Sequence, residues 1–353
     1  MREIKYSIVI VNFNGKEYLE RTVRSVLNSN YQNFKIIIVD NNSTDGSVQH
    51  IEQTFVKNLA KIKFVQLEKN FGPAKARNEG VKIATGQVYG FLDNDTEVTA
   101  DWLINADKVF EQDEKVGALQ CKLLFLKDKK SIDYVGEYLG SLGFLISIAE
   151  YGEPDNGQYD QVKEILAAKS AGMFITRQAF EAAEGFDEDY FIFVEETDLG
   201  WRCWLKNYKV VFCPESVVYH HYSATKDITD KKFNNKLVRF HGCKNYILTL
   251  YKNLSFKYLV RILPKHIFLW NGLAFYLLFK GNWTSGINIL KGIMWFFLHL
   301  PANYKKRRRI QKNRKLSDQQ LFIEQGLYKK KSIFYFIKRF TDSQKKAVTP
   351  ENQ

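Results

Sequence analysis

The sequence has few cysteines, and their spacing fits neither a zinc ribbon nor a disulfide framework. Its 353 residues include four cysteines, none in a C-x-x-C pair: Cys121, Cys203, Cys213 and Cys243. Disulfide-rich secreted domains and zinc ribbons are therefore excluded, and a reducing compartment is expected. The first predicted strand is followed by N-F-N-G-K-E and not by G-x-G-x-x-G, which argues against a nicotinamide dehydrogenase.

Long apolar runs are also missing. A short apolar run at residues 8–11 follows a charged N-terminus and ends too early for a signal peptide. No unbroken apolar stretch reaches the roughly 18 residues that a membrane-spanning helix needs. Neither secretion nor an ordinary transmembrane anchor is expected.

Acidic residues are scarce at one end of the chain. Residues 226–353 hold 27 Lys and Arg against 6 Asp and Glu, whereas residues 1–225 hold 25 against 33. Residues 257–300 are rich in Phe, Leu, Ile and Trp, and residues 305–315 contain eight basic residues in eleven. This pattern is typical of a region that lies on an anionic membrane surface. A helical subdomain with a solvated basic face is one alternative. Nucleic-acid binding without enzymatic activity is another, against which the acidic first two-thirds argues.

Short apolar segments alternate with segments of helical period in the first 120 residues. Strands are predicted at residues 7–11, 35–40, 62–67 and 88–92, and helices at residues 17–29 and 74–84. Strands that are apolar throughout favour a mostly parallel sheet flanked by helices, with ligands at the carboxyl ends of the strands. We therefore predict an α/β domain over residues 1–225 and a helical, basic region over residues 226–353.

Polar residues follow the predicted strands at the edge where ligands are expected. The carboxylate of Asp40 could accept hydrogen bonds from a base or ribose, or only cap the next helix. Asp93 and Asp95 offer the oxygen ligands that Mg²⁺ prefers, although Asp is also a turn former. Asp95 is the first candidate for a metal ligand.

Two further segments carry candidate site residues. Residues 70–80, N-F-G-P-A-K-A-R-N-E-G, predict a turn and the opening of a helix. Their polar residues could bind phosphate or sugar, or form an ordinary exposed turn. In F-I-F-V-E-E-T-D-L-G-W-R, residues 191–202, three acids repel one another unless a cation or a raised pKa relieves them, and a raised pKa suits a general base. A helix N-terminus would explain the same acids.

A histidine pair, His220 and His221, follows the last predicted strand of the first region. Such a pair is more often structural, but either residue could complete a metal site.

Taken in order, these motifs resemble those of glycosyltransferase family 2 enzymes with a GT-A fold, most closely the branch that includes rhamnosyltransferases. The resemblance extends from about Tyr6 to Ser223. It rests on S-I-V-I-V-N-F-N-G, V-D-N-N-S-T-D-G-S, N-F-G-P-A-K-A-R-N-E-G, F-L-D-N-D, G-F-D-E-D-Y-F-I-F-V-E-E-T-D-L-G-W-R and V-V-Y-H-H.

The resemblance implies a role for each motif. Asp40 would touch the base of a nucleotide-sugar, and Asp95 would hold Mg²⁺ or Mn²⁺ on its diphosphate, with His220 as a further metal ligand. The family's usual Glu-Asp pair falls on Glu195 and Glu196, so that Glu196 is the candidate catalytic base and Glu195 the alternative. Asp198 and Trp201 would face the acceptor. The residues expected to contact the donor are Asn12, Asn14, Asp40, Asn42, Lys75, Arg77, Asn78, Asp93 and Asn94.

The chemistry agrees with these roles. One base and one metal ion suffice for attack of a hydroxyl on the anomeric carbon opposite a departing nucleoside diphosphate, which implies inversion. We expect a metal-dependent, inverting glycosyltransferase of cell-envelope polysaccharide biosynthesis. The resemblance favours deoxythymidine diphosphate rhamnose or a uridine diphosphate sugar as donor, and a polysaccharide or lipid-linked oligosaccharide as acceptor. The enzyme is expected in the cytoplasm on the inner face of the cell membrane, without a nucleic-acid partner. Oligomerisation through the C-terminal region is left open.

Overall fold

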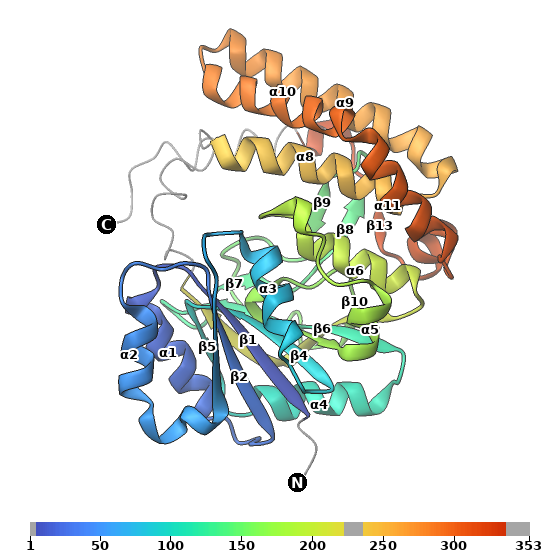
Figure 1. The fold of residues 1–353 in the computed structure, drawn as a ribbon. Coiled ribbons are helices and arrows are strands. Elements are labelled where there is room, and N and C mark those ends of the chain that lie inside the picture. Colours follow the sequence, from blue (N-terminus) through green and yellow to red (C-terminus); the bar gives the residue numbers. More distant parts are fainter. Residues whose placement is uncertain (1–4, 222–235, 337–353) are drawn as a thin grey trace. The chain divides into compact units, whose positions relative to one another are not determined.

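The computed structural model describes residues 5–221 and 236–336 (Figure 1). The chain divides into two compact units, Met1–Glu137 with Ser147–Ala224, and Tyr138–Ile146 with Thr225–Gln353. The predicted boundary after residue 225 and the end of the motif resemblance at Ser223 lie outside the described residues. Residues 138–146, which no feature of the sequence set apart, belong to the second unit.

The first unit is an α/β fold built on one large sheet. Its strands are β1 (Tyr6–Asn12), β2 (Phe34–Asp40), β3 (Ile62–Gln66), β4 (Val88–Asp93), β5 (Thr96–Val98), β6 (Val116–Phe125), β7 (Ile132–Tyr134), β10 (Lys163–Glu164), β11 (Met173–Thr176) and β12 (Lys209–His220). Its helices are α1 (Lys16–Leu27), α2 (Ser47–Thr54), η1 (Val56–Lys61), α3 (Pro73–Lys82), α4 (Trp102–Gln112), η2 (Ser170–Gly172), α5 (Arg177–Ala182), η3 (Glu188–Tyr190) and α6 (Glu195–Leu205).

The sheet is mixed: its longest strand pairings are parallel, as predicted, but it also contains antiparallel strands. The order of its strands is β10-β12-β6-β11-β4-β1-β2-β3, with β5 on β12 and β7 on β6. The first half, β3-β2-β1-β4, is parallel, but β11 runs antiparallel to both β4 and β6. No α-helix separates β6 from β11 along the chain, and a helical crossover is the usual connection between parallel strands.

The core of the first unit comes from strands that are apolar on both faces. Ile8 of β1 and Ile36 of β2 are buried with Leu19 and Val23, which a four-residue spacing places on one face of α1. On α3 a glycine permits close packing on the same strands. A Cβ on Gly80 would come within 2.6 Å of Val9 Cγ1 and 2.8 Å of Val39 Cγ2.

The second unit is helical, as predicted. It contains α8 (Lys236–Asn253), α9 (Phe256–Phe279), α10 (Trp283–Leu298), α11 (Leu300–Lys312) and η4 (Gln320–Glu324), with a small sheet of β8 (Glu137–Gly140), β9 (Leu145–Ser147) and β13 (Tyr328–Lys329) in the order β13-β8-β9. Phe144, from the segment between β8 and β9, lies against Tyr246, His266 and Trp270. His266 Nδ1 is 2.8 Å from the Leu142 carbonyl oxygen. This segment is therefore tied to α8 and α9.

Among the described residues one helix, α9, is long and apolar enough to cross a membrane by length and composition. The expectation from unbroken apolar runs missed it, because Lys265 and His266 interrupt its apolar residues. Of its most apolar 18-residue window, 33% is buried inside the structure. Length and composition alone say little about a span, because core helices of soluble proteins pass the same test.

The packing of α3 generates a stability prediction. Gly80→Ala should lower the free energy of unfolding by about 1–3 kcal/mol, because the added methyl group must displace Val9 or Val39 in a close-packed core. The control Gly242→Ala lies on α8, where a Cβ meets nothing within 4 Å, and should be neutral or stabilising by up to about 1 kcal/mol. Thermal and denaturant unfolding of the full chain, followed by circular dichroism, gives the change in free energy of unfolding for each variant. Equal effects from both variants would contradict the packing role of Gly80.

Candidate active site

Strand register brings distant acidic and histidine residues to one edge of the sheet. β4 ends at Asp93, which lies opposite the end of β1. β5 runs antiparallel to β12 and pairs Thr96 with His220. Asp95 directly precedes Thr96, so the same pairing brings Asp95 to the end of β12.

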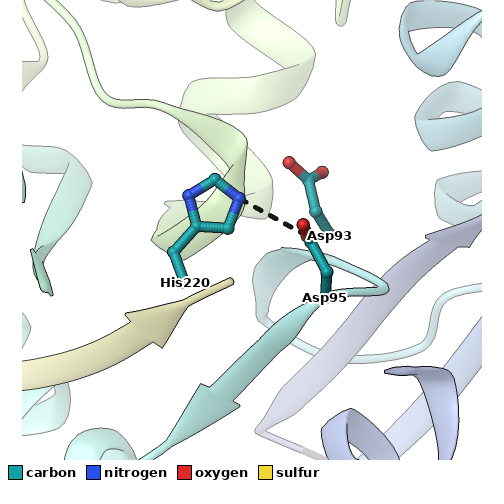
Figure 2. Close-up of side chains that lie close together, drawn as sticks. All are labelled: Asp93, Asp95 and His220. Carbon is teal, nitrogen blue, oxygen red and sulfur yellow. Dashed lines mark ion pairs between the residues drawn. The ribbon is translucent and has the colours of Figure 1, made fainter. Parts of the chain in front are cut away.

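Asp93, Asp95 and His220 form a cluster whose candidate ligand atoms all lie within 4.8 Å of one another (Figure 2). His220 Nε2 is 3.4 Å from Asp95 Oδ1, and its Nδ1 is 2.9 Å from Asp133 Oδ2. A carboxylate on Nδ1 fixes the ring and aims the other nitrogen at the cluster, an arrangement typical of metal-binding histidines. Two carboxylates and an imidazole suit Mg²⁺ or Mn²⁺, so these residues fit a divalent cation.

The cluster also favours positive charge electrostatically. Burial opposes protonation of His220, but its hydrogen bonds to Asp133 and Asp95 outweigh burial and raise its pKa well above 6.5. Of the two histidines, His220 faces the cluster. The backbone N–H of His221 donates to the Asp95 carbonyl oxygen at 2.9 Å, and its ring lies 4.6 Å from that of Tyr18, centroid to centroid.

Arg77 of α3 links this cluster to a second group of acids. Its side chain is 3% exposed, with Nη2 3.1 Å from Asp93 Oδ1 and Nη1 3.0 Å from Glu195 Oε1. Nη1 is also 4.0 Å from Glu196 Oε1. Burial opposes the charge of Arg77, but the carboxylates outweigh it and raise its pKa. The guanidinium of Arg77 is enclosed and turned toward protein carboxylates, and its expected contact with the donor stays a prediction.

The two adjacent glutamates at the start of α6 differ in their surroundings. The side chain of Glu195 is 3% exposed, and burial together with the charge of Glu196 raises its pKa, against the opposing effect of Arg77. The side chain of Glu196 is 18% exposed. Its Oε1 accepts hydrogen bonds from Ser170 Oγ at 2.6 Å and from the Ser170 backbone N–H at 3.3 Å. Glu196 is therefore held in place while remaining open to solvent.

The backbone that presents these glutamates is strained. Phe191, Phe193 and Val194 have positive φ angles of 61°, 73° and 67°, a conformation that is costly for a β-branched residue such as valine. Gly72, at φ +81°, packs against this segment, since a Cβ there would lie 2.6 Å from the Phe191 carbonyl oxygen. Two motifs far apart in the sequence, residues 70–80 and 191–202, thus meet at the site.

The predicted donor residues at the ends of β1 and β2 form a buried network. Asn12 Nδ2 donates to Asp40 Oδ1 at 2.8 Å, and Asn94 Nδ2 donates to Asn12 Oδ1 at 2.9 Å. Asp40 also accepts hydrogen bonds from Ser43 and Gln66. Asp40 therefore holds the following loop, and its contact with a base stays a prediction.

Asn14 and Asn42 are exposed beside this network. The side chain of Asn14 accepts a hydrogen bond from the Thr44 backbone N–H at 2.8 Å, and Asn42 has a positive φ of 67°. Both lie in or against the loop that follows β2. Their predicted contacts with a donor remain predictions.

Two predicted donor residues of α3 engage the turn that contains η3. Asn78 Nδ2 donates to the Phe186 carbonyl oxygen at 2.9 Å, and its Oδ1 accepts from the Phe186 N–H at 3.0 Å. The amide of Asn78 thus holds the chain near η3, and its contact with a donor stays a prediction. Lys75 is half-buried, with Nζ 4.3 Å from the ring centroid of Phe71 and 3.7 Å from Glu188 Oε2.

Asp198 and Trp201, predicted to face an acceptor, lie in the interior of the first unit, and their contact with an acceptor stays a prediction. Both side chains are buried. Asp198 Oδ2 accepts from Arg202 Nε at 2.8 Å, and Arg202 also donates to the Gly185 carbonyl oxygen. α6 is buried nearly all round, with every residue from Thr197 to Leu205 in the interior, so both side chains are enclosed by protein.

Two residues of the site, Asp133 and Ser170, were not found from the sequence. Both belong to or border residues 127–169, which match none of the motifs. Each is a polar residue next to an apolar run, in S-I-D-Y-V and K-S-A-G-M-F. A buried polar side chain needs a hydrogen-bond partner. A polar residue beside an apolar run was therefore the one signal in the sequence that could have pointed to Asp133 and Ser170.

Two family models match the chain: glycosyl transferase family 2 over residues 7–169, and glycosyl transferase family group 2 over residues 91–304. The O-antigen biosynthesis protein RfbC of Myxococcus xanthus is 30% identical over 230 residues, which are 62% of this chain and 17% of that protein. The putative teichuronic acid biosynthesis glycosyltransferase TuaG of Bacillus subtilis is 39% identical over 97 residues, 28% of this chain and 38% of that protein. The chain spans less than half the length of these relatives.

Solved structures resemble the fold at low sequence identity. The crystal structure of GalNAc-T7 with UDP, GalNAc and Mn²⁺ has a TM-score of 0.56 at 18% identity, covering 73% of this chain and 49% of that one. The mannosyltransferase PcManGT of Pyrobaculum calidifontis, in complex with GDP-Man and Mn²⁺, has a TM-score of 0.52 at 14% identity, covering 82% and 86%. These likenesses concern the fold alone. The family models, one of which covers more than half of the chain, place this protein in glycosyltransferase family 2, and its first unit has the GT-A fold.

Proposed function

We propose that this protein is an inverting glycosyltransferase that moves a sugar from a nucleoside-diphosphate sugar to a hydroxyl group with the help of a divalent cation. One observation carries the proposal: the Asp93–Asp95–His220 cluster is joined through Arg77 to Glu195 and Glu196. A place to hold a cation on a diphosphate and a carboxylate close to it are the two parts that this reaction needs.

The cation would be held by Asp93, Asp95 and His220. A bound Mg²⁺ or Mn²⁺ supplies Lewis-acid stabilisation of the negative charge that develops on the departing diphosphate. Asp133 keeps the His220 ring turned so that Nε2 points toward the carboxylates. Arg77 holds one oxygen of Asp93, which leaves the second carboxylate oxygen for other contacts.

Glu196 is the proposed base. It is the more exposed of the two glutamates, and Ser170 fixes its orientation through two hydrogen bonds. In this role Glu196 takes the proton of the acceptor hydroxyl, while Glu195 remains enclosed and holds Arg77 in place. With Asp93 and Asp95 assigned to the cation and Glu195 enclosed, Glu196 is left to serve as base and none of these four carboxylates as nucleophile, which supports inversion at the anomeric carbon.

The substrate classes rest on resemblance and on the names of similar proteins. The motifs favour deoxythymidine diphosphate rhamnose or a uridine diphosphate sugar as donor. The names of the relatives RfbC and TuaG, which refer to O-antigen and teichuronic acid biosynthesis, support a surface polysaccharide or its lipid-linked precursor as acceptor. The proposed place of the reaction is the cytoplasmic face of the cell membrane.

The metal cluster gives the first test of this function. Asp95→Ala should abolish Mn²⁺-dependent nucleotide-sugar hydrolysis, and Asp133→Asn, which disturbs His220 from behind, should weaken Mn²⁺ binding roughly 10- to 100-fold. Mn²⁺ binding is measured by electron paramagnetic resonance, independently of turnover. The control Asp113→Ala removes an exposed carboxylate that pairs with Lys209, and should leave both measurements unchanged. Unaltered Mn²⁺ binding by Asp95→Ala would refute the site.

The glutamate pair gives the second test. Glu196→Gln keeps the shape of the side chain but cannot accept a proton, so kcat should fall roughly 10²- to 10⁴-fold with donor affinity nearly unchanged. Glu195→Gln should instead lower stability, because the buried Arg77 loses a charged partner. Steady-state kinetics and thermal unfolding distinguish the loss of a base from the loss of stability in the two variants. The anomeric configuration of the product, determined by NMR, tests inversion. If Glu195→Gln alone shows the pure kcat defect, the base is Glu195.

A further inference from the structure

Helix α9 has one face packed inside the second unit and another left open. Its buried residues include Ile262, His266 and Trp270. The exposed apolar residues recur at multiples of three to four residues, so that they share the opposite side of the helix: Phe256, Val260, Phe268, Phe275 and Phe279. The ring of Phe279 is 88% exposed. A helix that meets only water normally carries polar residues on such a face.

Helix α10 repeats this pattern. It buries Gly286, Ile289 and Gly292, and the two glycines permit close contact with neighbouring helices. A Cβ on Gly286 would come within 2.6 Å of Leu278 on α9, and one on Gly292 within 2.9 Å of the Phe240 carbonyl oxygen on α8. The exposed apolar residues of α10 are Trp283, Ile287, Met294, Phe297 and Leu298.

Exposed apolar side chains gather where the turn at residues 280–282 joins α9 to α10. We name this group the hairpin tip, and it consists of Phe275, Tyr276, Phe279, Trp283 and Ile287. All of these side chains are exposed, and Trp283 is 63% exposed. Two other aromatic residues of the apolar stretch 257–300, Trp270 and Phe296, are buried in the helical core.

The charged side chains of α8, α9, α10 and α11 are all of one sign. From Lys236 to Ser317 the sequence contains no Asp or Glu. Exposed basic residues accompany the apolar ones at the hairpin tip and along α9, α10 and α11. They are Lys257, Arg261, Lys265, Lys280, Lys291, Lys305, Arg308 and Arg309. Apolar and aromatic side chains among cations match the acyl chains and anionic head groups of a bilayer. A second copy of the same surface would set cations against cations without any carboxylate to offset them.

The buried face of α9 indicates how the hairpin meets a bilayer. His266 is fully buried, 2.8 Å from the Leu142 carbonyl oxygen, and Trp270 Nε1 donates to His266 Nε2 at 2.9 Å. One side of α9 is therefore committed to protein contacts. The exposed side of α9 carries Lys257, Arg261 and Lys265 besides its apolar residues. A helix whose exposed side mixes apolar side chains with cations is typical of the membrane interface.

We infer that the outer face of α9 and α10 docks on an anionic lipid bilayer, with the hairpin tip inserted most deeply. These residues would hold the protein at the membrane face where the proposed function places the reaction. Only the lipid-linked acceptor rests on that proposed function. The apolar tip gives salt-resistant attachment, while the basic residues give attachment that weakens as salt screens the head groups.

The test uses the full chain and vesicles of phosphatidylcholine with about 30% phosphatidylglycerol. The triple variant Phe275→Ser, Phe279→Ser, Trp283→Ser should lose at least about tenfold in vesicle binding measured by sedimentation at high salt. The matched control changes three exposed apolar residues of the first unit, Val56→Ser, Tyr151→Ser and Val162→Ser, and should bind like the unaltered chain. Unchanged binding by the tip variant would overturn the inference.

A second measurement locates the tip within the bilayer. Trp283 is the most exposed of the six tryptophans, so brominated lipids should quench its fluorescence, and Trp283→Phe should remove that quenching while vesicle binding persists. Concentration-dependent dimers, or nucleic-acid shifts, in place of vesicle binding would refute the membrane partner. Mn²⁺-dependent nucleotide-sugar hydrolysis is measured on the same preparations and should survive in the tip variant. Vesicle binding without any such hydrolysis would defeat the proposed function and support the docking surface.

Discussion

The candidate site depends on one buried cation among carboxylates. Arg77 pairs with Asp93 on one side and Glu195 on the other, and Glu196 lies 4.0 Å away. Without that charge the carboxylates would repel one another, and breaking such a buried pair costs about 3–5 kcal/mol. Arg77 reaches this place because α3 lies close to β1 and β2 over Gly80. The acids that would bind a metal and the acid that would accept a proton are therefore held in one electrostatic unit.

The sequence allowed prediction of the elements that local patterns determine. The strands up to β4 and the helices α1 and α3 follow from apolar periodicity, and Asp93, Asp95 and His220 follow from their positions after strands. The direction of β11 was not predictable, since it depends on a connection without a helix. The role of Arg77 also escaped, because its partner Glu195 lies 118 residues away and nothing local distinguishes a guanidinium that binds phosphate from one that binds carboxylates.

The same limit applies to burial within helices. Composition revealed that residues 257–300 are apolar and basic. Which of their aromatic side chains are buried and which are exposed depends on tertiary contacts. Trp270 is turned inward by its hydrogen bond to His266, whereas Trp283, after the turn at Gly281, is turned outward. The burial of Asp198 escaped prediction for a related reason. This residue lies three residues after Glu195, and the turn of α6 carries it into the core, where Arg202 pairs with it.

The path of the chain has a consequence for how this protein is inherited and engineered. The chain leaves the first unit after Glu137, contributes residues 138–146 to the second, returns at Ser147 and leaves again after Ala224. The helices that receive Phe144 are encoded about a hundred residues downstream of it. A single recombination breakpoint between the two units would separate Phe144 from its partners, so the helices of the second unit cannot be exchanged as a simple C-terminal cassette. Any chimera must transplant the residue 138–146 segment together with the helices or redesign both sides of that contact.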